Sequence, residues 1–263
     1  MRQYLVDAFA DDVFQGNPAA VCLLARWPEE VWLQNVAREN GQPETAFLVP
    51  GQQENEYSLR WFSPEMEVDL CGHATLAAAY VVFHFLERDA SEVIFQTKSG
   101  PLLVRRRGEL LEMDLPAYTL KPLEVTDAIV DALGVRPKEV WRARDLVCVF
   151  EREEDVLNMR PDLEKVKALK GALMQVTAPG TKYDCITRTF APKMGLAEDP
   201  VCGSGHCHVI PYWTQRLGRK ELVARQASQR GGTLYCRMEG DRIFIAGRAV
   251  VYAQCELMLE EPK

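Results

Sequence analysis

The fold is decided by a stretch of sequence that occurs twice in the chain. The first copy reads RWFSPEM at residues 60–66 and continues to CGH at 71–73, whereas the second reads RTFAPKM at 188–194 and continues to CGS at 202–204. Both copies have the spacing R-x-F-x-P-x-M, then a short acidic loop, then a Cys-Gly pair that leads into a helix. Since the offset is close to half of the 263 residues, the repeat predicts two related domains with the same order of elements.

Residues around each copy alternate between apolar and polar, which is typical of half-buried strands. Strands are expected at 57–62, 93–95, 102–104, 110–113, 184–190, 234–238 and 242–245, and surface helices at 127–133 and 163–170. A helix expected over 74–86 is apolar on every side, and such a helix is surrounded by other structure. Its counterpart is expected over 204–217, interrupted by Pro211. The pattern predicts an α+β fold in which a curved sheet wraps a helix.

The length of the chain also favours two domains, because 263 residues exceed the usual size of a single core. The turn Asp114-Leu115-Pro116 is the expected boundary, which gives an N-terminal domain of residues 1–115 and a C-terminal domain of residues 116–263. The last strand could pack back on the N-terminal domain.

The composition narrows the class of partner. A net charge of −7, with 47% hydrophobic and 26% charged residues, is ordinary for a soluble protein and gives no reason to expect a nucleic acid or an anionic membrane surface as partner. The longest apolar run, 76–86, is too short to span a bilayer and contains His84. The first residues lack the apolar core of a signal peptide, so the expected location is cytoplasmic, where the eight cysteines would be mostly free thiols.

Both Cys-Gly pairs enter a helix, whose first N–H groups have no partner within the helix and carry partial positive charge. Gly72 stands at the first start, and Gly203, Ser204 and Gly205 stand at the second. Each start is a ready site for a carboxylate, so the sequence predicts a small anionic substrate where the two starts face one cleft. The alternative is that the glycines only permit tight turns.

The cysteines of these pairs, Cys71 and Cys202, suggest a second chemistry. A thiol at a helix N-terminus is expected to have a lowered pKa, and two such thiols could remove and return a proton on opposite faces of a carbon. The alternative is two small buried hydrophobic residues. His73 and His206 could add nitrogen ligands for a metal, but the chain has neither CxxC nor HxxxH, so no metal is expected.

A third segment carries a candidate acid or base. Glu44 lies just before the apolar strand 46–49, where Pro43 fixes the approach of the chain and Gly41 frees the loop. A carboxylate at the entrance of a strand, beside apolar residues, could shuttle protons near neutral pH. The alternative is a solvated carboxylate in a loop.

Several motifs, in this order and over nearly the whole chain, resemble the PhzF-like (phenazine biosynthesis-like) family. They are FQGNPAAV at 14–21, PETAF at 43–47, DLCGHAT at 69–75, EDPVCGSGH at 198–206 and QRGG at 229–232. The resemblance implies a diaminopimelate epimerase-like fold of two pseudo-symmetric domains, each a curved, barrel-like sheet around a central helix, with the active site between them. It also implies catalysis without a cofactor or a metal. The characterised chemistry of the family is isomerisation of a small cyclic amino acid, a dihydro-hydroxyanthranilate.

By this resemblance, the acid/base carboxylate falls on Glu44, and substrate-side polar positions fall on His73, Asp199 and Ser204. The amides of Gly72, Gly203 and their neighbours would hold the substrate carboxylate. Two departures bear on the mechanism. The related racemases have cysteines at the positions of Cys71 and Cys202, a pair that the phenazine enzyme lacks, and the epimerase pattern Asn-Cys-Gly-Asn-Gly is absent because Leu70 and His73 replace its asparagines.

The leading hypothesis is therefore a proton-transfer isomerase in which Glu44 moves a proton on the substrate while His73 and Asp199 assist. A racemase or epimerase that uses Cys71 and Cys202 is the second hypothesis. A non-catalytic member of the family that binds another protein is the third. Related proteins often pair, so a homodimer is compatible with each of them.

Overall fold

The computed structural model describes residues 1–259, and these residues form two compact units. Unit 1 contains Met1–Asp114 and residues 246–259, and unit 2 contains Leu115–Ile245. The chain therefore passes into unit 2 at the Asp114-Leu115-Pro116 segment and returns to unit 1 for its last strand. Within residues 1–259, no helix is both long and apolar enough to cross a bilayer.

Unit 1 is built on one sheet whose strands are mostly antiparallel. The strands are β1 (Arg2–Ala8), β2 (Asn17–Leu23), β3 (Glu44–Pro50), β4 (Glu56–Phe62), β5 (Glu67–Val68), β6 (Glu92–Thr97), β7 (Gly100–Arg107), β8 (Leu110–Pro116, whose last two residues begin unit 2) and β18 (Ala249–Glu256). They pair in the order β18-β1-β2-β3-β4-β6-β7-β8, and β5 folds back on the end of β4. The pairs β2–β3 and β4–β6 are parallel.

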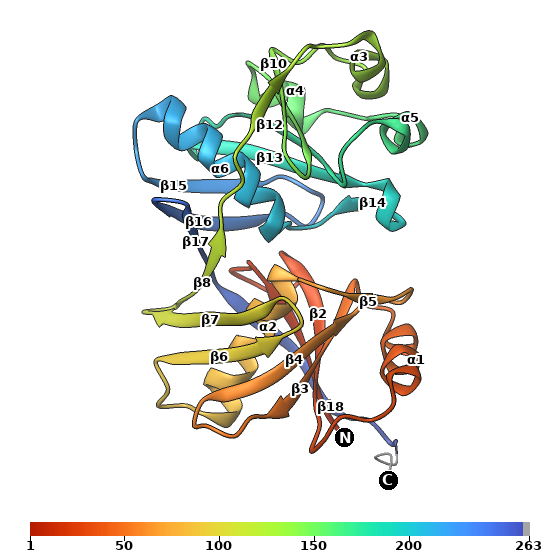
Figure 1. Ribbon diagram of the computed structural model, residues 1–263, viewed down its shortest axis with the longest axis vertical. Helices are drawn as coiled ribbons and strands as arrows, with labels where there is room; N and C mark the ends of the chain where they lie inside the picture. The colour runs from red at the N-terminus through yellow and green to blue at the C-terminus, as the bar shows by residue number, and fades with distance from the viewer. Residues whose placement is uncertain (260–263) are drawn as a thin grey trace. The chain divides into compact units, whose positions relative to one another are not determined.

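The central element of unit 1 is helix α2 (Gly72–Val81), which continues into a π-helical turn (Val82–Leu86). It packs against β1, β2, β3 and β18 (Figure 1). Eight of its ten residues are buried, which confirms that the helix apolar on every side is surrounded by other structure. The helix begins at Gly72, two residues before the expected start at Ala74. Helix α1 (Glu30–Asn40), which the sequence analysis did not predict, packs its own apolar residues against Phe47 and Phe62.

Unit 2 repeats this succession. Its strands are β9 (Lys121–Leu123), β10 (Glu139–Arg142), β11 (Leu146–Val149), β12 (Met174–Pro179), β13 (Cys185–Ala191), β14 (Leu196–Asp199), β15 (Glu221–Gln226), β16 (Gly232–Glu239) and β17 (Arg242–Gly247, whose last two residues belong to unit 1). The order β9-β10-β11-β12-β13-β15-β16 is parallel at β11–β12 and β13–β15, and β14 folds back on β13. Both parallel pairs and the folded-back strand have a counterpart in unit 1.

The helices of unit 2 are α3 (Asp127–Leu133), α4 (Glu153–Leu157), α5 (Leu163–Ala168) and α6 (Gly203–Leu217). Helix α6 occupies the position that α2 has in unit 1, because it follows the folded-back strand and packs on β12, β15 and β16 (Figure 1). The chain thus has an α+β, diaminopimelate epimerase-like fold in which each unit surrounds a central helix. A cluster of apolar side chains from α3, α4, α5 and the sheet forms a further core in unit 2.

The arginine of the first copy of the repeated motif forms an ion pair with a glutamate of the next strand. Arg60 donates through Nε to Glu67 Oε1 at 2.6 Å and through Nη2 to Glu67 Oε2 at 2.7 Å. Its guanidinium also lies 5.1 Å from the centre of the Phe62 ring, a cation–π distance. Phe62 and Glu67 are paired residues of β4 and β5. The motif therefore holds the hairpin that delivers the chain to the start of α2.

The second copy makes the same contacts. Arg188 donates through Nε and Nη2 to the two carboxylate oxygens of Glu198 at 2.8 and 2.9 Å, and its guanidinium lies 4.9 Å from the centre of the Phe190 ring. Phe190 and Glu198 are paired residues of β13 and β14. A bidentate arginine–carboxylate pair fixes geometry as well as charge. The repeat is therefore one structural device, used twice, that places a Cys-Gly pair at the start of a buried helix.

Proline at position 211 lies inside α6 and cannot donate to the carbonyl four residues earlier. That carbonyl, of Cys207, instead accepts a hydrogen bond from the backbone N–H of Tyr118 at 3.0 Å. The Tyr118 ring stacks on His208 of the same helix, with ring centres 4.0 Å apart and planes 12° from parallel. The proline thus creates the attachment point for the segment that follows β8.

Candidate functional site

The start of α2 gathers polar side chains from three segments of unit 1. Cys71 precedes the helix and His73 is its second residue, while Asn17 and Glu44 are the first residues of β2 and β3. Because β2 and β3 are parallel, with Ala19 paired to Glu44, both strands begin at the same edge of the sheet. The fold thereby brings a carboxylate, an amide, an imidazole and a thiol to one end of a buried helix.

Side-chain distances show a connected group centred on His73. Its Nε2 lies 3.1 Å from Glu44 Oε2, and its Nδ1 lies 3.0 Å from Asn17 Nδ2. The Cys71 sulfur lies 3.5 Å from the same Nδ1. The side chain of His73 is 7% exposed and that of Glu44 is 16% exposed. The carboxylate therefore reaches the surface of unit 1, while the imidazole behind it is almost completely buried.

Burial lowers the pKa of His73, but the adjacent Glu44 carboxylate outweighs it and raises the pKa well above its ordinary value. An opposite charge within hydrogen-bond distance favours the charged form of a buried group. The imidazole is therefore held as a cation beside Glu44. This ion pair keeps the carboxylate pointing at the start of α2 and compensates its charge.

At the corresponding position of unit 2, Cys202 precedes α6, and its sulfur accepts a hydrogen bond from the Gly205 N–H at 3.3 Å. The Ser204 hydroxyl lies 3.5 Å from that sulfur. The Cys202 N–H donates to Gln226 Oε1 at 2.8 Å, and Gln226 Nε2 donates to the Asp199 carbonyl at 2.7 Å. Gln226 therefore ties the end of β14 to the start of α6. Asp199 and Ser204, both expected at the site, are thus brought to the same helix start.

The expectation that a helix N-terminus lowers the pKa of both thiols is wrong. Burial, followed by the Glu44 carboxylate, raises the pKa of Cys71. Burial, followed by the Asp199 carboxylate, raises the pKa of Cys202 well above its ordinary value. At each helix start, burial of the thiolate and one nearby carboxylate both disfavour the charged sulfur. Together they outweigh the favourable partial positive charge of the helix end. Both sulfurs are held as thiols at neutral pH.

His206 has no free nitrogen for a metal. Its Nδ1 donates to the Cys202 carbonyl at 2.8 Å, and its Nε2 is 3.2 Å from the Thr187 hydroxyl. Burial lowers its pKa to about 4. In the described part of the chain, the one group of three close metal-ligand types is Glu44, Cys71 and His73, with ligand atoms within 4.8 Å of one another. The hydrogen bonds among these three already account for that closeness.

Gly205 has a role that the sequence analysis did not assign to it. A Cβ at this position would lie 2.6 Å from both side-chain amide atoms of Gln175 on β12. Such a contact is far shorter than van der Waals distance, so a side chain here would have to displace Gln175 from its hydrogen bonds with Asp145 and Thr189. The expected role of Gly205 in substrate binding stays a prediction, whereas its role in close packing is a property of the fold.

Four polar residues behind the start of α6 were missed by sequence reasoning. Arg144 donates through Nε and Nη2 to both oxygens of Asp145 at 2.8 and 2.9 Å. Asp145, which is fully buried, also accepts from Gln175 Nε2 at 3.1 Å, and its backbone N–H donates to His208 Nε2 at 3.3 Å. These residues come from β12, α6 and the turn before β11. Nothing in their sequence spacing indicates that they meet, although Arg144-Asp145 is a charged pair entering an apolar strand.

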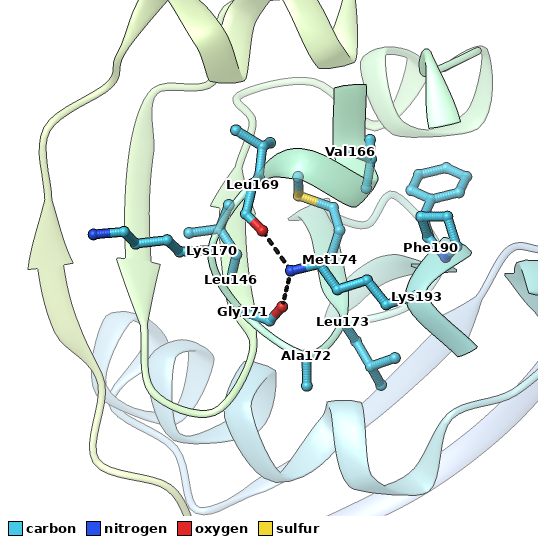
Figure 2. Close-up of a pocket in the computed structure, with 11 residues that line it drawn as sticks. Leu146, Val166, Leu169, Lys170, Gly171, Ala172, Leu173, Met174, Phe190 and Lys193 are labelled. Carbon is cyan, nitrogen blue, oxygen red and sulfur yellow. Dashed lines mark hydrogen bonds between the residues drawn. The ribbon is translucent and has the colours of Figure 1, made fainter. Parts of the chain in front are cut away.

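A cavity elsewhere in unit 2 is unsuited to a substrate. Figure 2 shows the Lys193 side chain reaching the carbonyls of Leu169 and Gly171, which accept from Nζ at 2.5 and 2.6 Å. The cavity beside it, which Met174 and Phe190 also line, has a volume of about 10 Å³. That is about the space one water needs. Lys193 is therefore a structural cap for the end of α5.

Comparison with known proteins identifies the class. The family described as phenazine biosynthesis-like protein matches residues 6–255, and the chain belongs to this family. An uncharacterised isomerase of Pseudomonas aeruginosa is 46% identical over 257 residues, covering 97% of this chain and 98% of that protein. The human phenazine biosynthesis-like domain-containing protein is 40% identical over 276 residues, covering 94% and 96%.

Solved structures agree. A phenazine biosynthesis protein of the PhzF family from Enterococcus faecalis is 44% identical, with a TM-score of 0.95 over 98% of this chain and 99% of that one. A probable proline racemase from Agrobacterium radiobacter, solved with bound carbonate, has a TM-score of 0.67 at 11% identity, covering 98% and 93%. The second likeness concerns the fold alone. Together they confirm the family resemblance and the epimerase-like fold expected from the motifs.

Proposed function

We propose that the protein is a cofactor-independent isomerase that transfers a proton on a small carboxylate or cyclic amino-acid-like substrate. One observation carries this proposal: a surface-reaching carboxylate, Glu44, is paired at 3.1 Å with a buried, positively charged His73 at the start of α2. A base of this kind must reach solvent or substrate on one side and be held firmly on the other.

In this mechanism Glu44 removes a proton from an activated carbon and redelivers it elsewhere on the same substrate. The hydrogen bond between His73 Nε2 and Glu44 Oε2 keeps the carboxyl group in place during the transfer. The amides of Gly72 and Gly203 hold the substrate carboxylate, since the first N–H groups of a helix favour anions. Asp199 and Ser204, beside the start of α6, hydrogen-bond the remainder of the substrate.

Relatives support the reaction class. Three bacterial proteins that are 42–46% identical to this chain are named as uncharacterised isomerases. A hydroxyproline epimerase with bound trans-4-hydroxy-L-proline shares the fold at 12% identity. The rival mechanism, with Cys71 and Cys202 as the two bases, has a specific observation in its favour, because both sulfurs stand immediately before corresponding helices. The raised pKa of each thiol weighs against it.

The test is isotope exchange. Small cyclic and acyclic amino acids are incubated with the protein in D₂O, and loss of C–H signals is followed by proton NMR. The proposal predicts exchange or isomerisation by the wild-type protein and by a Glu54→Gln control, which alters an exposed carboxylate. Glu44→Gln should lower the rate by at least about 100-fold, the usual contribution of a general base.

Each rival predicts a different pattern of results. Full activity in Glu44→Gln combined with inactivity of Cys71→Ala and Cys202→Ala would replace this mechanism with the two-thiol one. Absence of exchange with every compound, together with affinity for a protein partner, would instead favour a non-catalytic binding protein.

A further inference from the structure

Arg144 stands out among the polar side chains of unit 2 because it is fixed in place yet partly exposed. Its Nη2 donates to the Ser204 hydroxyl of α6 at 3.0 Å, so the guanidinium lies directly beside a residue of the proposed substrate site. Its side chain is 35% exposed. An arginine at this location presents a planar positive group where the proposed function requires recognition of an anion.

The guanidinium is oriented from behind by the fully buried carboxylate of Asp145, which accepts from Nε and Nη2. Asp145 is fixed in turn by the Gln175 amide at 3.1 Å, and Gln175 accepts from the Thr189 hydroxyl at 2.6 Å. A chain of hydrogen bonds from β13 through β12 thus determines the direction of the arginine. A flexible arginine loses conformational freedom when it binds a ligand, which weakens binding. Arg144 is already held in one direction in the folded protein, so this cost is smaller.

One face of the guanidinium lies over an aromatic ring, since the centre of the Tyr118 ring is 5.5 Å from the Arg144 Cζ. Within residues 1–259, the hydrogen bonds of Arg144 use Nε and Nη2 only. The two N–H groups of Nη1 are therefore available to an acceptor. A carboxylate is the acceptor that best matches an oriented guanidinium edge.

We propose that Arg144 binds the carboxylate of the substrate at the α6 end of the site and so sets specificity for acids over neutral compounds. This inference rests on the proposed function and deepens it by naming a side chain that binds the substrate carboxylate beside the helix amides. Arg144 is a binding residue for the negatively charged end of the substrate, whereas Glu44 performs the proton transfer. An arginine that served only to neutralise Asp145 would leave ligand affinity unchanged when replaced.

The experiment measures affinity by calorimetry for 2-aminobenzoate, a planar cyclic amino acid, and for 2-aminobenzamide, its neutral counterpart. Arg144→Gln should weaken binding of the acid by at least about tenfold, the lower range for a charge-assisted hydrogen bond, without changing binding of the amide. Arg142→Gln, on the same segment, should leave the affinity for both probes unchanged. If Arg144→Gln fails to fold, Arg144→Lys, which keeps the charge but loses the planar edge, should weaken binding of the acid selectively.

Equal affinity of wild-type and Arg144→Gln for 2-aminobenzoate would overturn the proposal, as would equal loss for both probes. Failure of the wild-type protein to prefer the acid over the amide would overturn the class of ligand. The proposed function is tested separately by Glu44→Gln. This variant should keep its affinity for 2-aminobenzoate and lose proton exchange. Retained exchange in Glu44→Gln with selective loss of acid binding in Arg144→Gln would refute only the mechanism.

Discussion

The two buried histidines at the helix starts should have pKa values that are shifted in opposite directions. His73 and His206 are both almost completely buried, so burial alone would lower the pKa of each. His73, however, lies 3.1 Å from the Glu44 carboxylate, whereas His206 contacts only a carbonyl and a hydroxyl. The pKa of His73 is raised well above 6.5, and that of His206 is lowered to about 4. A single proton NMR titration of the imidazole signals separates the two.

Replacing Glu44 with Gln removes the carboxylate that raises the pKa of His73, so that pKa should fall while the pKa of His206 stays near 4. A hydrogen bond to a charged group contributes about 1.5–3 kcal/mol to stability. The Glu44→Gln change should therefore cost free energy in this range at a pH where the imidazole is charged. A His73 signal that titrates at or below 6.5, or one that is insensitive to Glu44→Gln, would refute the ion pair.

The raised pKa also sets a pH dependence of stability. Because the folded-state pKa of His73 exceeds the unfolded value, its stabilising contribution is fully present below about pH 6.5, the ordinary histidine value. The contribution is lost as pH rises through the folded pKa. The stability difference between the wild-type protein and His73→Gln, measured by urea denaturation, should therefore shrink with rising pH. A difference that grows over this range would contradict the assignment.

Three further predictions concern packing and thiols. Leu76→Ala, at a fully buried position of α2, should cost about 2–5 kcal/mol of unfolding free energy. Val31→Ala, on the exposed face of α1, should change the unfolding free energy by at most about 0.5 kcal/mol. Equal effects of the two substitutions in denaturant unfolding would contradict the buried position of Leu76. Gly205→Ala should cost about 1–3 kcal/mol by forcing Gln175 aside, and an unchanged melting temperature would show that the contact is not close. Cys255, the one exposed cysteine in the described chain, should react first with a thiol reagent at neutral pH, and fast modification of a second thiol in the native protein would contradict the burial of the others.

Much of the fold could be predicted because its decisive features are local. Arg60 and Phe62 recur as Arg188 and Phe190 since each pair forms the same ion-pair and ring contacts around a hairpin. The all-apolar composition of α2 likewise indicated its burial without knowledge of the partners. Helix α1 was missed because only three of its residues are buried, so its apolar pattern is weak. Contacts with the rest of unit 1, which the sequence does not show, stabilise it as a helix.

The site was predictable in part. Glu44 and His73 were expected from the motifs. Glu44 stands where the parallel strands β2 and β3 begin at one edge of the sheet, and there it contacts His73 at the start of α2. The thiol pKa values were predicted in the wrong direction, because desolvation depends on the whole surrounding core and the sequence shows only the helix end. The site role of Arg144 and Asp145 was missed because, apart from each other, their hydrogen-bond partners Ser204 and Gln175 lie 60 and 30 residues away on other elements.

A crystal structure of Glu44→Gln with bound 2-aminobenzoate would examine the central claim most directly. The account predicts that the carboxylate of the ligand contacts the first amides of α6 and the Arg144 guanidinium. It also predicts that a ring carbon lies within about 3–3.5 Å of the residue 44 side chain, the separation needed for proton transfer. A ligand bound far from residue 44, or a side chain at 44 directed into solvent away from the bound ring, would contradict it.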